Sequence, residues 1–242
     1  MTWHATKNNW YTPNSQEAID NATEAANLLI NSFGWSQAAC CGMFGHIDYE
    51  GMWNPWSWQG TGSPEAGALT RTQAQNEHGT SHGYGLIGWT PSGKYQFNNF
   101  ATSGGVIYFP NYNQESYPGY APYFKNEESV ASATDGAAQI RLIATAMANA
   151  SPNIWVRRSG EPYNYSPAEF IAMTDPELAA KTWLWRAERP SSIFDPDRRP
   201  YTESARSRAA RDWSTRLDWD LPASPNKIII YKRITDRSRG FL

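Results

Sequence analysis

Glu50 is the residue of this sequence best suited to act as an acid. It closes a helix that we expect to run from Ser36 to about Glu50, where the helix macrodipole disfavours negative charge. Apolar and aromatic residues surround it in the sequence: Tyr49, Met52, Trp53, Pro55, Trp56 and Trp58. Burial among such groups should raise the pKa of the carboxyl group. A carboxylic acid that stays protonated near neutral pH is what glycoside hydrolysis requires. The plainer alternative is a solvated glutamate at a helix end.

A second carboxylate would be needed to activate an attacking water in a two-carboxylate mechanism. Glu77, in QNEHGTSHGYG, is the candidate, because it lies in an irregular region shortly before the segment GYGL. The alternative for Glu77 is an exposed loop residue. Glu65 and Asp48 are weaker candidates. Asp48 lies about 200° around the predicted helix from Glu50 and should face away from it.

Aromatic side chains are unusually frequent, with 12 Trp and 13 Tyr in 242 residues. Their flat apolar faces stack on sugar rings, and they also fill protein cores. Those nearest to the candidate acids are predicted to line a saccharide groove: Trp53, Trp56, Trp58, Tyr84 and Trp89. Trp183 and Trp185 are instead expected in the core, with Glu188 paired to Arg186 or Arg189.

Metal and thiol chemistry are not expected. His46, His78 and His82 do not form an HExxH pattern, and the sequence has no Cys-x-x-Cys pair. Cys40 and Cys41 are adjacent, so a disulfide between them would be strained, and buried thiols are the expected state. We therefore predict no metal and no cofactor.

The predicted elements are mostly helical. Ser15, Ser166 and Asp175–Pro176 provide helix starts, Gly34 provides a stop, and apolar residues recur at helical spacing between such signals. The predicted helices cover residues 15–33, 36–50, 127–149, 167–173, 176–188 and 202–217. Residues 51–125 are rich in Gly, Pro, Asn and Ser, which indicates loops and short strands, with GYGLIGWT (83–90) as a strand or turn.

These elements predict a mainly α (α+β) fold in which a helical domain and a small irregular or β lobe form a cleft. The domain should cover residues 1–220. Residues 221–242 include NKIIIYKRITDRSRGFL and are predicted to be a basic C-terminal arm. The net charge of −2 and the pI of about 6.1 argue against nucleic-acid binding. No secretory signal or transmembrane stretch is apparent, so no membrane contact is expected.

Four blocks of the sequence, in order, resemble the phage tail lysozyme family. The first is Asn21–Ala22, the second lies in SQAACCGMFGHIDYEGMWNP (36–55), and the others are GYGLIGWTP (83–91) and WLWRAERP (183–190). Within and just before the second block, the residues that match the family pattern are Trp35, Ser36, Ala39, Gly42, Gly45, Glu50, Asn54 and Pro55. The resemblance implies a lysozyme-like fold, with Glu50 as the catalytic acid. It also implies hydrolysis of the β-1,4 bond between N-acetylmuramic acid and N-acetylglucosamine in bacterial peptidoglycan.

Three positions depart from the family pattern. His46 stands in place of an asparagine, Gly51 in place of a serine, and Gly88 in place of a glutamine. A non-catalytic glycan-binding or tail-structural module therefore stays an alternative, as does a lytic transglycosylase that uses the same Glu50. The resemblance favours a virion-borne tail enzyme, made in the host cytoplasm, that acts on the cell wall beside other tail proteins. A free endolysin is the alternative.

Overall fold

The computed structural model describes residues 3–4, 6, 15–50, 52–55, 85–88, 101–103, 106–108, 135–148 and 154–220. Helices account for most of this part of the chain. They are α1 (Gln16–Phe33), α2 (Gln37–Ile47), α4 (Asp135–Ala148), α5 (Pro167–Ile171), α6 (Pro176–Trp183), the π-helix η3 (Leu184–Glu188), the 3-10 helix η4 (Ser191–Phe194) and α7 (Arg199–Arg216). The mainly α fold predicted from the sequence is therefore confirmed.

The helix ends follow the capping residues. Ser15 accepts a hydrogen bond from the backbone of Ala18, and Gly34 ends α1 with a φ of 69°. Ser166 forms a capping box with Glu169 at the start of α5, and Asp175 caps α6. The helix predicted over 127–149 is present as α4 from Asp135, and residues 127–134 lie outside the described part. The helix predicted to reach Glu50 ends earlier, at Ile47, and continues as a turn.

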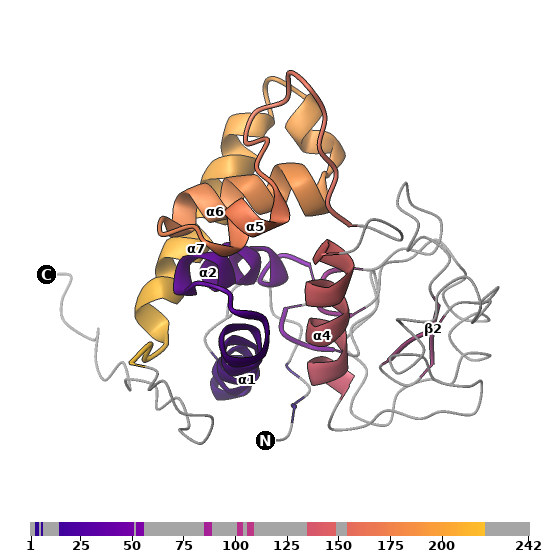
Figure 1. Cartoon of the computed structure of the whole chain (residues 1–242), viewed down its shortest axis with the longest axis vertical. Helices are drawn as coiled ribbons and strands as arrows, with labels where there is room; N and C mark the ends of the chain where they lie inside the picture. The colour runs from indigo at the N-terminus through magenta and orange to yellow at the C-terminus, as the bar shows by residue number, and fades with distance from the viewer. Residues whose placement is uncertain are drawn as a thin grey trace, which may run out of the picture.

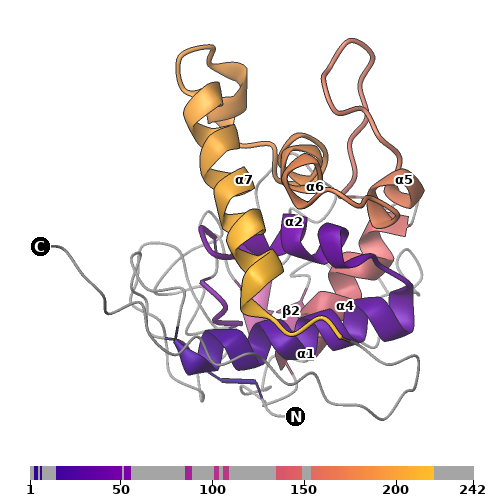
Figure 2. The same ribbon diagram turned by 90° about the vertical axis from the view of Figure 1, so that its left-hand side faces the viewer.

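Helix α2 forms the centre of the packing, and its residues from Ala38 to Ile47 are all buried. It packs against α6 and α7 on one side and contacts α1 on the other, as Figure 1 shows. Two glycines allow this close approach. A Cβ at Gly42 would lie 2.6 Å from the Cβ of Ala179, and one at Gly45 would lie 2.8 Å from the carbonyl oxygen of Arg206. Helix α7 therefore crosses α2 closely (Figure 2), which brings α7 side chains to the end of α2.

Aromatic side chains fill the core around α2. Phe44 contacts Trp53 edge-on, with 4.8 Å between ring centroids, and Trp213 lies 5.2 Å from Trp53. Trp183 is 1% exposed and Trp185 is 3% exposed, so the prediction that both are core residues is confirmed.

Only short pieces of the predicted irregular lobe are described. Residues 85–88 form a turn, and β1 (Ala101–Ser103) pairs antiparallel with β2 (Val106–Tyr108), with Ala101 opposite Tyr108. The lobe as a whole, the cleft and the division at residue 220 stay predictions, since most of residues 51–134 and all of 221–242 lie outside the described part. Within the described residues, no helix has the length and apolar character to span a bilayer.

Candidate active site

Glu50 lies in a turn directly after α2. Its backbone N–H donates to the carbonyl of His46 at 3.0 Å, as does that of Tyr49 at 2.9 Å. The next described residues, Met52 and Trp53, both have positive φ, 47° and 63°. This left-handed pair is unusual for non-glycine residues, and it reverses the chain sharply after Glu50. The turn thus fixes the position of the carboxyl group close to the C-terminal end of a buried helix.

The two carboxyl oxygens of Glu50 have different surroundings. Oε1 lies 3.2 Å from Nη2 of Arg206, which comes from α7. Oε2 faces the turn 85–88, since a Cβ at Gly88 would lie 3.0 Å from it. The side chain of Glu50 is 31% exposed, so it is partly buried and still open to a ligand. Because Arg206 donates to Oε1, a proton on this carboxyl group belongs on Oε2.

The surroundings of Glu50 favour the protonated form of its carboxyl group. Burial raises its pKa above the usual value, and the opposing effect of the Arg206 charge is smaller. The direction agrees with the raised pKa that the sequence predicts for Glu50.

Arg206 is shared between two glutamates. Its Nη2 donates to Oε1 of Glu188 at 2.8 Å as well as to Glu50, and its guanidinium lies 4.1 Å from the ring centre of Tyr49. The Arg206 side chain is 10% exposed and that of Glu188 is 11% exposed. Glu188 was expected to pair with Arg186 or Arg189, and that expectation is wrong.

His46 completes this group of residues. Its Nδ1 contacts Oε2 of Glu188, and its Nε2 lies 2.9 Å from the carbonyl oxygen of Ala180 in α6. The side chain is fully buried, and this burial, together with the positive charge of Arg206, holds the pKa of His46 well below its usual value. The site is therefore a chain of contacts from Glu50 through Arg206 and Glu188 to His46.

Buried amide side chains hold the backbone that follows Glu50 and the turn that faces its carboxyl group. Asn21 donates to the carbonyl of Trp53 at 2.7 Å. Gln139 of α4 donates to the carbonyl of Pro55 at 2.7 Å and accepts from the backbone N–H of Leu86 at 2.9 Å. Gln139 thus ties the segment after Glu50 to the turn that faces its Oε2. We did not single out Gln139 from the sequence, although a glutamine on the apolar stripe of a predicted helix could have drawn attention to it.

Trp53 does not line a groove, so its predicted contact with a saccharide is wrong. The side chain is fully buried, and its Nε1 donates to Asp48 at 2.9 Å. The positive φ of Trp53 directs the indole under α2, against Phe44 and Trp213. The other predicted site residues lie outside the described part of the chain: Glu77, Trp56, Trp58, Tyr84 and Trp89.

Asp48 is bound to side chains of the core. Its carboxylate accepts from Trp53 and from Nε1 of Trp213 at 2.8 Å, and Arg216 lies 3.7 Å away. Burial raises its pKa to about 7. Asp48 is therefore engaged with the tryptophan core.

The prediction that both cysteine thiols are buried is confirmed. Cys40 and Cys41 are free and fully buried, and burial raises the pKa of both. Within the described residues, no group of three or more His, Cys, Asp or Glu side chains is arranged to hold a metal ion.

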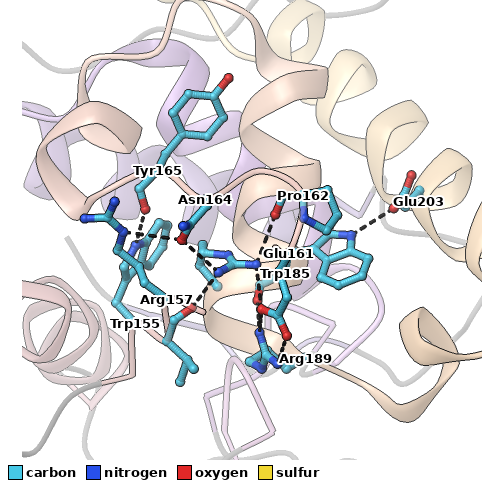
Figure 3. A network of polar contacts seen from close by, with 11 residues as sticks. Trp155, Arg157, Glu161, Pro162, Asn164, Tyr165, Trp185, Arg189 and Glu203 are labelled. Atoms are coloured by element: carbon cyan, nitrogen blue, oxygen red, sulfur yellow. Dashed lines mark hydrogen bonds and ion pairs between the residues drawn. The ribbon is translucent and has the colours of Figure 1, made fainter. Parts of the chain in front are cut away.

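A second cluster of charges lies on the other side of η3. Glu161 accepts from Arg189 through both carboxylate oxygens, each at 2.7 Å, and from Nη2 of Arg186 at 2.9 Å (Figure 3). Arg186 also donates to the carbonyls of Val156 and Pro162, each at 3.0 Å. These bonds attach the loop 156–165 to the helix turn that ends at Glu188.

A comparison with protein families covers most of the chain. The family model described as phage tail lysozyme matches residues 20–217, which include Glu50, Glu188 and Arg206. The chain belongs to the phage tail lysozyme family. A curated relative, Morphogenesis protein 1 of Bacillus phage B103, is 32% identical over 89 residues. That match covers 36% of this chain and 20% of the relative's length.

Proposed function

We propose that this phage lysozyme-family protein is a peptidoglycan hydrolase that cleaves the β-1,4 bond between N-acetylmuramic acid and N-acetylglucosamine. The observation that carries the proposal is the Glu50 carboxyl group. It is partly buried, its pKa is raised, and one oxygen is held by Arg206 while the other faces the turn 85–88. These are the properties of a general acid in glycoside hydrolysis.

In this proposal Glu50 gives the proton on Oε2 to the glycosidic oxygen as the bond to the anomeric carbon breaks. Arg206 then stabilises the carboxylate that forms, since it already donates to Oε1. A water attacks the anomeric carbon, and Glu77 is the proposed base that positions this water and takes its proton. Trp56, Trp58, Tyr84 and Trp89 are the proposed saccharide contacts. The reaction needs no metal or cofactor.

The first test compares wild type with Glu50→Gln on purified peptidoglycan, with muropeptide masses as the readout. Glu177→Gln is the matched control, since Glu177 lies in an exposed ion pair with Arg211. We expect Glu50→Gln to lower the rate by roughly 10²–10⁴-fold, the usual contribution of a general acid, and Glu177→Gln to leave it unchanged. The products should be muropeptides with reducing ends.

Other outcomes would assign a different function. Anhydro products would identify a lytic transglycosylase that uses the same acid. A wild type that cleaves none of several wall types would indicate a non-catalytic glycan-binding or tail-structural module. Full activity in Glu50→Gln would mean that another residue is the acid.

We further propose that the protein is part of the phage tail and acts on the host cell wall during entry. The family and the phage morphogenesis relative support this assignment over a free endolysin. Mass spectrometry of purified virions should detect the chain as a structural component beside other tail proteins. Detection only in the lysate, and not in virions, would favour the endolysin.

A further inference from the structure

His46 contacts Glu188, which in turn contacts the arginine that donates to Glu50. The backbone carbonyl of Ala180 only accepts hydrogen bonds, so the His46 Nε2 at 2.9 Å from it must carry a hydrogen. The other ring nitrogen, Nδ1, contacts a carboxyl oxygen of Glu188. Two lone pairs would repel at this contact, so it must contain a proton of its own.

That shared proton makes the pair electrically neutral. If the proton lies on Nδ1, an imidazolium faces a carboxylate; if it lies on Oε2, a neutral imidazole faces a carboxylic acid. Either arrangement sums to zero charge. Both side chains are buried, with exposures of 1% for His46 and 11% for Glu188, so solvent does not separate the two facing atoms.

Arg206 donates to both oxygens of Glu188, from Nη2 to Oε1 at 2.8 Å and from Nε to Oε2 at 3.5 Å. With the shared proton in place, Glu188 balances less of the Arg206 charge than these two contacts suggest. Its guanidinium is largely buried and contacts Oε1 of Glu50 through the same Nη2. The charged and titratable groups around this site, within the described chain, are Tyr49, Asp48 and His46 from α2 and the turn that follows it, Glu188 from η3, and Arg206 from α7. Asp48 is hydrogen-bonded to Trp53 and Trp213 and lies near Arg216, whereas the Glu50 carboxyl group accepts from Arg206 directly.

We propose that His46 and Glu188 are positioning residues that share one proton and thereby leave Arg206 to act on Glu50. The inference rests on the proposed function in that Glu50 is taken to be the acid. It adds that a buried histidine, remote from the substrate, sets the pH range in which this acid keeps its proton.

Two substitutions distinguish a proton shared by His46 and Glu188 from an ordinary salt bridge between Glu188 and Arg206. His46→Gln removes the shared proton, because an amide nitrogen donates to Glu188 and leaves it a full carboxylate. Glu188 then balances Arg206, and the pKa of Glu50 should rise. Glu188→Gln replaces a neutral pair by a neutral amide that still accepts from Arg206 and donates to Nδ1. The pKa of Glu50 should then stay close to that of the wild type.

The experiment follows the side-chain ¹³C signal of Glu50 in the full-length protein as the pH is raised, assigned by its loss in Glu50→Gln. Imidazole ¹⁵N shifts report on His46 in the wild type, where the ring should show no titration between pH 5 and 8. Glu177→Gln is the control, because it removes one negative charge from an exposed ion pair outside this group of residues. In wall-cleavage assays, the loss of activity at high pH should move to higher pH in His46→Gln and stay in place in Glu188→Gln.

A Glu50 signal that titrates alike in wild type and His46→Gln would overturn the proposal. A clear fall of the Glu50 pKa in Glu188→Gln would also overturn it, since Glu188 would then be a full carboxylate in the wild type. If His46→Gln does not fold, a wild-type His46 ring that titrates with an ordinary histidine pKa leads to the same rejection. The NMR signals need no catalysis, so the expected shifts in a protein without wall-cleaving activity would refute the proposed function alone.

Discussion

Two groups of arginines and glutamates lie on opposite sides of the π-helix η3. They have opposite ratios of arginine to glutamate side chains. On one side a single carboxylate, Glu161, is held by Arg186 and Arg189. On the other side a single guanidinium, that of Arg206, contacts both Glu50 and Glu188. Arg186 and Glu188 are two positions apart, so a helix directs their side chains to nearly opposite faces.

The two groups also differ in the pKa of their carboxyl groups. Hydrogen bonds and charge from Arg189, with support from Arg186, lower the pKa of Glu161 to about 2. Glu50 receives one longer contact from an arginine that also contacts Glu188, and burial raises its pKa. The first group therefore suits a permanent structural link, and the second suits a carboxyl group that gains and loses a proton.

Glu161→Gln should have the largest effect on stability. The substitution leaves Arg186, which is fully buried, and Arg189, which is 2% exposed, without their carboxylate. Removing one partner of a buried ion pair typically costs about 3 kcal/mol or more. We expect the free energy of unfolding at pH 7 to fall by about 3 kcal/mol, measured by urea denaturation, while cleavage per folded molecule is retained.

The pH dependence provides the control for this prediction. The pKa of Glu161 is lowered by folding, so its stabilisation is complete above the unfolded value of 4.5 and is lost as the pH falls towards about 2. The stability gap between wild type and Glu161→Gln should therefore narrow over that range. Glu177→Gln, in a pair whose side chains are 60% and 39% exposed, should change stability by less than about 1 kcal/mol. Equal losses in the two variants would contradict the comparison.

Gly88→Ala should alter the site with a smaller effect on the fold. Gly88 has a φ of 61°, where an alanine is strained by about 1 kcal/mol. Its new Cβ would lie 3.0 Å from Oε2 of Glu50, so the carboxyl group must move. A misplacement of about 1 Å can slow catalysis by about 10²-fold, so we expect this smaller shift to slow wall cleavage by about tenfold.

Gly34→Ala is the control that separates backbone strain at a positive φ from contact with the Glu50 carboxyl group. Gly34 has a similar φ of 69°, but an added Cβ there meets nothing within 4 Å. This variant should lose a comparable amount of stability, about 1 kcal/mol, and keep its activity. If both variants lose activity equally, Gly88 has no special relation to Glu50.

Local signals explain how much of the fold could be predicted. Ser15, Gly34, Ser166 and Asp175 cap helices through bonds to residues only a few positions away, and the sequence reveals such bonds directly. The family blocks likewise point to Glu50 as the candidate acid, and the structure places it beside Arg206. These features depend on neighbouring residues or on a recognisable pattern, so they require no knowledge of the tertiary structure.

The rest of the site depends on long-range contacts. Glu188 has arginines two positions before it and one after it, yet it contacts Arg206, 18 positions away, and His46, 142 positions away. Nothing in the sequence distinguishes Arg206 among the arginines of its helix. Trp53 was assigned to the groove because it follows Glu50 closely. The tertiary structure instead buries the indole against Phe44 and Trp213, after two residues with positive φ.

Glu50→Gln should have the smallest effect on stability and its direction should be opposite to that of Glu161→Gln. A glutamate with a raised pKa binds protons more tightly in the folded state, so its contribution to stability falls as the pH rises through its unfolded and then its folded pKa. A glutamine cannot ionise and avoids this penalty, although it keeps an oxygen that accepts from Arg206. The free energy of unfolding at pH 7 should therefore equal or slightly exceed that of the wild type. A clear loss of stability in Glu50→Gln would mean that the Glu50–Arg206 contact is a structural ion pair like that of Glu161, and the contrast between the two sides of η3 would then be lost.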